Sequence, residues 1–102
     1  MVKRLTKEIA EKYLSIVPSD KYFYIHEGPV LKNMEDLSKA IFEITEDQFS
    51  YHRNSLKNDF YMWVLGVIDD VKLAHDIARA RTKETTRKKI ESRIISLKKI
   101  IS

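Results

Sequence analysis

A chain of 102 residues with 43% hydrophobic and 33% charged residues is long enough for one folded domain and too short for two. It contains no cysteine, which excludes disulfides, cysteine nucleophiles and cysteine-ligated zinc. The net charge is +4, and the longest apolar run, nine residues at 60–68, is far shorter than the roughly 20 residues needed to cross a bilayer as a helix.

The N-terminal segment mixes charged residues with apolar ones, whereas a signal peptide needs an unbroken apolar stretch. We therefore expect a cytoplasmic protein that does not use a membrane. A domain of this size buries only roughly 60 to 65% of its extended-chain surface, so a partner or a second copy would add useful interface.

The first predicted element is a helix over 6–17, where apolar residues recur at helical spacing before Pro18. An aromatic, β-prone run at 22–25 follows. The turn residues of 27–29 separate it from Val30 and Leu31. This pattern predicts a short hairpin over 21–32, the only sheet in the fold.

Side chains that cap helices mark the starts of the next helices. Thr45 and Gln48 have the spacing of a capping box, in which each side chain bonds the other residue's backbone amide. The other starts are predicted at Asn33, at Asn58, and at Asp69 or Asp70. The helix from Asn58 should end near 66–69 and form the centre of the core. The apolar positions of these helices are Met34, Leu37, Ile41, Ile44, Phe49, Phe60, Trp63, Val64, Val67, Val71, Leu73, Ala74, Ile77 and Ala78.

The last predicted helix runs from about Lys83 to the end, and its apolar residues step by four, three and four positions, as in a helix that packs along a narrow seam. An isolated charged helix of about 18 residues is marginal in water, so the seam must meet the domain or another copy of itself. We favour a homodimer through a seam formed by Ile90, Ile94, Leu97 and Ile101. The predicted fold is mainly α: about six helices, a compact core over 1–78, and a long basic helix within 79–102.

Positive charge is concentrated in this last segment. Residues 79–102 carry nine basic side chains against two acidic ones, a net of +7, while residues 1–78 carry a net of −3. Basic side chains that neutralise phosphates release counterions, so RNA, DNA or the ribosome is the natural polyanionic partner. The basic residues surround the seam on its other sides, which also fits a solvated amphipathic helix. The candidate nucleic-acid-binding residues are Arg79, Arg81, Lys83, Arg87, Lys88, Lys89, Arg93, Lys98 and Lys99.

Over residues 21–78 the order of features resembles a family of small archaeal and bacterial domains of unknown function. Its most specific part is the run Phe49-x-x-His52-x5-Asn58-Asp59-Phe60-x-x-Trp63. The resemblance implies a compact stand-alone fold and no particular reaction. The basic C-terminal helix lies outside it. The remaining matching residues are Tyr22, Phe23, Tyr24, Gly28, Leu37, Asp70, Leu73 and Ala74.

Within that run, His52 and Asp59 are an imidazole and a carboxylate in one neighbourhood, which acid–base catalysis would need. The same residue types commonly cap and pack helices, and we favour this structural role for Phe49, His52, Asn58, Asp59, Phe60 and Trp63. The three histidines lack metal-ligand spacing, and two glycines cannot build the usual phosphate loop. We predict no metal, no cofactor and no enzymatic activity.

The sequence therefore predicts a non-enzymatic interaction module that self-associates through the seam and contacts nucleic acid or the ribosome through its basic helix. The alternative is a scaffold or adaptor that binds only proteins and has no affinity for nucleic acid. An enzyme that uses His52 and Asp59 is the remote alternative.

Overall fold

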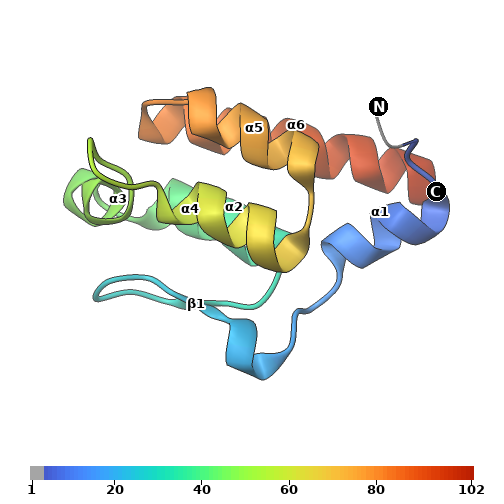
Figure 1. Ribbon diagram of the computed structural model, residues 1–102, viewed down its shortest axis with the longest axis horizontal. Helices are drawn as coiled ribbons and strands as arrows, with labels where there is room; N and C mark the ends of the chain where they lie inside the picture. Colours follow the sequence, from blue (N-terminus) through green and yellow to red (C-terminus); the bar gives the residue numbers. More distant parts are fainter. Residues whose placement is uncertain (1–3) are drawn as a thin grey trace.

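The structure is a computed structural model that describes residues 4–102 and measures 37 × 27 × 21 Å. Its fold is mainly α, as predicted (Figure 1). Within the described part of the chain, six α-helices accompany one two-stranded antiparallel hairpin. The elements in order are α1 (Lys7–Leu14), the 3₁₀ turn η1 (Ser19–Lys21), β1 (Phe23–Tyr24), β2 (Val30–Leu31), α2 (Met34–Glu43), α3 (Glu46–His52), α4 (Asp59–Trp63), the π-helical turn η2 (Val64–Ile68), α5 (Val71–Arg79) and α6 (Lys83–Ile101).

The predicted helix starts are confirmed. Asn33, Asn58 and Asp70 each accept a hydrogen bond on the side chain from the backbone N–H three residues ahead. Thr45 and Gln48 form the predicted capping box, with both reciprocal bonds present. Each of these bonds satisfies an amide that would otherwise lack a partner in the first helical turn.

Helix α1 is shorter than predicted, because the chain leaves the helix at Ser15 in an extended conformation. The N–H of Val17 then donates to the carbonyl of Lys32 at 2.9 Å, so this segment runs beside the end of β2. The apolar spacing of 6–17 still held in one respect, since Val17 is buried. A tertiary hydrogen bond has replaced the last helical turn.

The hairpin pairs Phe23 with Leu31 and turns its Phe23 side chain into the core. Its turn is tight: Glu27 has a positive φ of 53°, and a Cβ on Gly28 would lie 2.7 Å from Cγ2 of Ile25. Gly28 is therefore needed because no side chain fits at that position. The turn also fixes the position of His26 at the tip.

Helix α6 packs against α1, α2 and α5 of its own chain (Figure 1). Ile90 and Leu97 are completely buried, Ile94 is buried and Ile101 is half-buried. The seam is thus covered in a single molecule, and the prediction that these four residues mediate self-association is wrong. For the same reason the core is not complete at residue 78, because α6 supplies part of it.

The buried polar centre of the fold is the pair of Asp70 and Arg93. The guanidinium donates from Nε to Oδ2 at 2.7 Å and from the second nitrogen to Oδ1 at 2.8 Å. The side chains are 1% and 9% exposed. Tyr13 packs beside Arg93, and its burial, together with the nearby charges of Asp70 and Asp69, raises the pKa of the phenol. Arg93 was predicted to bind nucleic acid. This prediction is wrong, because the guanidinium is buried and forms its ion pair with Asp70.

The intramolecular role of the seam gives the first prediction. Leu97→Ala should lower the free energy of unfolding by about 2–5 kcal/mol, because it leaves a cavity in the core. Ile95 lies on the same helix but is 56% exposed, so Ile95→Ala should change the free energy of unfolding by less than about 0.5 kcal/mol. Urea denaturation measures both. If Leu97→Ala instead split a dimer seen by light scattering and left monomer stability unchanged, the assignment of the seam to the core would be incorrect.

The buried ion pair gives the second prediction. Arg93→Met keeps an apolar side chain of similar length but leaves the Asp70 carboxylate buried without its cation, which should cost about 3–5 kcal/mol. Lys98→Met breaks the exposed pair with Glu35 and should cost less than about 1 kcal/mol. Equal losses in the two variants, measured by denaturant unfolding, would contradict a special role for the buried pair.

Candidate functional site

The structure divides the nine basic residues that were predicted to face a polyanion. Four of them have carboxylate partners. Their positive charges are offset locally, so they attract a distant phosphate less strongly than free cations do. The pairs are Arg87 with Glu91 at 2.8 Å, Lys88 with Glu84 at 3.6 Å, Lys98 with Glu35 at 2.6 Å, and Arg93 with Asp70 at 2.7 Å.

The other five, which are Arg79, Arg81, Lys83, Lys89 and Lys99, make no ion pair with any carboxylate of residues 4–102. Four of them lie at the end of α5, in the turn that follows it, or in the first turns of α6. Lys99 lies near the other end of α6, about 24 Å from Lys83 at a rise of 1.5 Å per residue. Within residues 79–102, the unpaired charge is therefore concentrated at the junction of α5 and α6.

Arg53, which was not among the predicted site residues, adds to this charge. Its side chain donates to the carbonyls of Ala78 and Ala80, each at 3.2 Å, which brings the C-terminal end of α3 to the end of α5. These carbonyls end a helix, where a cation is favourable. No local pattern could have indicated the contact, because the partners are 25 and 27 residues away.

We call the group of Arg53, Arg79, Arg81 and Lys89 the basic corner. Two open hollows meet at Arg79 and Arg81, which line both. The larger, about 750 Å³, is completed by Arg53 with the adjoining loop, and the smaller, about 350 Å³, by Lys89 and the start of α6. The smaller hollow also contains Asp76, whose carboxylate is paired with Lys72 at 2.8 Å.

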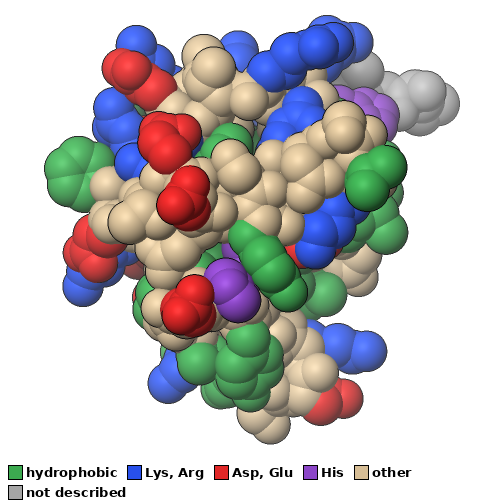
Figure 2. Space-filling view, turned by 90° about the vertical axis from the view of Figure 1, so that its left-hand side faces the viewer, with side chains coloured by type: hydrophobic (Ala, Val, Ile, Leu, Met, Phe, Trp, Pro, Cys, Tyr) green, Lys and Arg blue, Asp and Glu red, His purple; other side chains and the backbone are tan. Residues whose placement is uncertain are grey.

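Figure 2 shows this end of the molecule face on. Lysine and arginine side chains lie mainly over its upper part, interspersed with acidic ones, and in its lower half a histidine lies between hydrophobic and acidic side chains. Basic and hydrophobic side chains thus lie on the same face of the molecule.

The second cluster predicted from the sequence centres on His52. Its Nε2 accepts the backbone N–H of His26 at 2.9 Å, and its Nδ1 lies 2.9 Å from Oδ2 of Asp59. An amide can only donate and an ionised carboxylate can only accept, so Nδ1 carries the proton and Nε2 does not. The same carboxylate oxygen also accepts a hydrogen bond from Lys57 at 2.9 Å. Neither ring nitrogen of His52 is free to act on a substrate.

The other polar atoms of the motif also have partners inside the fold. Asn58 caps α4, and Nε1 of Trp63 donates to the carbonyl of Lys21 at 2.8 Å. Phe60 is fully buried between the Phe23 and Phe49 rings, with ring centroids 5.5 and 5.4 Å away. An open hollow of about 380 Å³ touches His52, Asp59 and Trp63, but it contains no free acid–base pair. The geometry is that of a packed, capped helix start.

Among residues 4–102, no group of three or more histidine or acidic side chains is placed to hold a metal ion. The structure sets His75 apart on the exposed part of α5. No helix in the described chain is both long enough and apolar enough to span a membrane.

No protein-family model, curated protein or solved structure matches the chain. The resemblance noted from the sequence therefore stays a prediction.

The third prediction tests the role of His52. His52→Phe keeps a ring among the aromatic side chains but removes the partners of the His26 amide and of Asp59, so unfolding should become easier by about 1–3 kcal/mol. His75→Phe, at an exposed position, should have little effect on thermal unfolding. An unchanged melting temperature in His52→Phe would show that these two bonds, one to the hairpin and one to α4, do not stabilise the fold.

Proposed function

We propose that this protein is a non-enzymatic module that binds RNA or DNA, either free or as part of a ribosome, through the basic corner. One observation carries the proposal. Within residues 79–102, most cations without carboxylate partners are gathered at the junction of α5 and α6, whereas four of the other basic side chains of α6 are paired with carboxylates. Opposite charges attract over about 10 Å at moderate salt, so such a cluster favours a polyanion.

The side chains of the basic corner suit phosphate in particular. Arginine presents a planar fork of donors that matches two phosphate oxygens, and Arg79 and Arg81 each border two hollows. Ser55 adds a hydroxyl to the larger hollow. Contacts of this type hold a nucleic-acid backbone without reading its sequence. We therefore expect binding that depends strongly on salt and weakly on sequence.

The frame of the basic corner is rigid, which lowers the entropy lost on binding. Thr82 and Thr85 form a capping box at the start of α6, and Arg53 is held by the carbonyls at the end of α5. Self-association is not needed for this function, since the seam is covered within one chain. A scaffold that binds only proteins would have no affinity for polyanions, so direct binding measurements separate the two functions.

The fourth prediction follows from this placement. Arg79→Ala combined with Arg81→Ala should weaken binding to a generic RNA about tenfold or more at moderate salt. It should also reduce the slope of log affinity against log salt by about 1.5, because two phosphate contacts are lost. Fluorescence anisotropy over a range of salt concentrations measures both quantities.

The matched control is Lys98→Ala combined with Lys99→Ala. It removes the same net charge from the opposite end of α6, and it should change affinity by no more than about twofold. If both double variants lost affinity equally, net charge and not the basic corner would drive binding. If the unmodified protein bound neither RNA nor DNA at low salt, the nucleic-acid function would be incorrect and the protein scaffold would replace it.

A further inference from the structure

Next to the basic corner lies a pair of stacked, exposed aromatic rings. The His26 imidazole and the Tyr51 phenol ring have centroids 3.9 Å apart and planes within 7° of parallel. The Tyr51 residue is 49% exposed and the His26 side chain 42% exposed. The core does not need this pair, since both rings lie outside the buried cluster. We call it the ring stack.

The ring stack is held in place from both of its elements. Tyr51 stands on α3, and the backbone of His26 is fixed by its N–H bond to His52. The amide of Gln48 donates to the carbonyls of His26 at 3.0 Å and Glu27 at 3.1 Å, which joins the hairpin tip to α3 again. The stack is therefore preformed, and little ordering is needed before a third ring adds to it.

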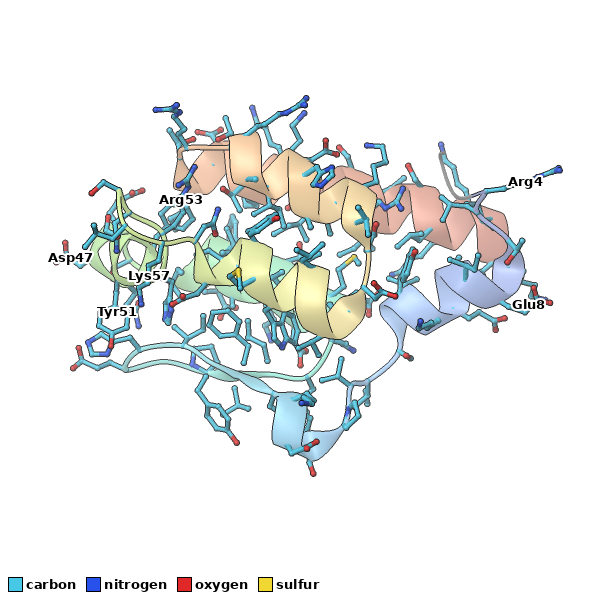
Figure 3. All side chains as sticks on the ribbon, viewed as in Figure 1. Arg4, Glu8, Asp47, Tyr51, Arg53 and Lys57 are labelled. Carbon is cyan, nitrogen blue, oxygen red and sulfur yellow. The ribbon has the colours of Figure 1, made fainter. Side chains whose placement is uncertain are left out.

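The ring stack is connected to the basic corner by contacts. Nζ of Lys57 lies 4.8 Å from the centre of the Tyr51 ring, and Asn54 donates its backbone N–H to the Lys57 carbonyl at 2.9 Å. Asn54 in turn lines the larger hollow together with Arg53. In Figure 3 the labelled Arg53, Lys57 and Tyr51 follow one another along the same end of the molecule. Lys57, whose ammonium is paired with Asp59, and Asn54 thus lie between the ring stack and the basic corner.

From this arrangement we infer that the nucleic acid bound by the protein is single-stranded, with an unpaired base stacked on the ring stack and the phosphates beside it in the basic corner. The inference rests on the proposed function. In a duplex the faces of the bases are already covered by their neighbours, so only an unpaired base offers a face to a protein ring. Successive bases on aromatic side chains and a backbone along cations are the usual features of single-strand binding.

Glu27 gives the surface a direction. Its carboxylate lies 3.1 Å from Nε2 of His26 and is highly exposed, so a phosphate at the tip of the hairpin would be repelled. The backbone of the strand is therefore expected on the side of Arg53, and the base on the side of His26. A duplex, which carries phosphates on both of its edges, fits this distribution of charge less well.

The test compares three probes of the same length, about ten nucleotides: a uridine strand, an abasic strand with the same phosphates, and a duplex. The unmodified protein should bind the uridine strand about tenfold or more tightly than the abasic strand and the duplex. Tyr51→Ala should abolish this preference while leaving affinity for the abasic strand unchanged. Tyr51→Phe, which keeps the ring, should retain the preference.

Phe42→Ala is the control, because Phe42 is an exposed ring on α2, 66% exposed against 49% for Tyr51, that belongs to neither surface. It should leave all three affinities unchanged. A 2-aminopurine in the strand should lose fluorescence on binding through stacking, and this loss should be absent in Tyr51→Ala. Circular dichroism melting confirms that each variant is folded. A matching deoxythymidine strand tells DNA from RNA, and a preference for bases on either strand supports the inference.

The two proposals fail in different ways. If the protein bound the abasic strand and the duplex as well as the uridine strand, and Tyr51→Ala changed nothing, the single-strand inference would be overturned. The proposed function would then still stand, provided that the Arg79 and Arg81 variant lost affinity. If no probe bound at low salt, both proposals would be overturned together.

Discussion

The arrangement of this domain depends on the buried pair of Asp70 and Arg93. The Asp70 carboxylate caps α5 through the N–H of Leu73 and accepts both guanidinium bonds from α6. A charge left alone at this depth would be costly, so the two helices cannot slide or rotate past each other without losing stability. This fixes the register of α6 against α5. It thereby also fixes the place of the turn between them, where Arg79 and Arg81 lie.

Most of the local structure could be predicted because its signals lie within a few residues of their effects. A capping side chain bonds an amide three positions ahead. Asn33 and Thr45 therefore indicate the starts of α2 and α3 without knowledge of the rest of the chain. The aromatic run and the turn around Gly28 indicated the hairpin in the same way. The apolar spacing of α6 also predicted its buried face correctly, since Ile90 and Leu97 are fully buried.

The candidate site could not be predicted as well, because it depends on contacts between distant residues. Periodicity shows which face of a helix is apolar but not what covers it, and so the α6 seam was assigned to a second copy when its own domain covers it. A count of charges cannot show that Arg93 meets Asp70 or that Lys98 meets Glu35. Likewise nothing near Arg53 in the sequence indicates the helix-end carbonyls that hold it.

The division between paired and unpaired charge has a physical consequence for binding. The basic corner is small, and a few phosphate contacts give only modest affinity, so any entropy spent on ordering the site would weaken it further. Arg53 is held by the carbonyls that end α5. The connection from α5 to α6 ends at Thr82, whose capping box with Thr85 fixes the start of α6. The residue before Arg53 is His52. Its ring accepts the backbone N–H of His26 and so holds the tip of the hairpin. Arg53 and the ring stack are therefore both positioned by hydrogen bonds at the C-terminal end of α3, and a change that loosens α3 should disturb both surfaces together.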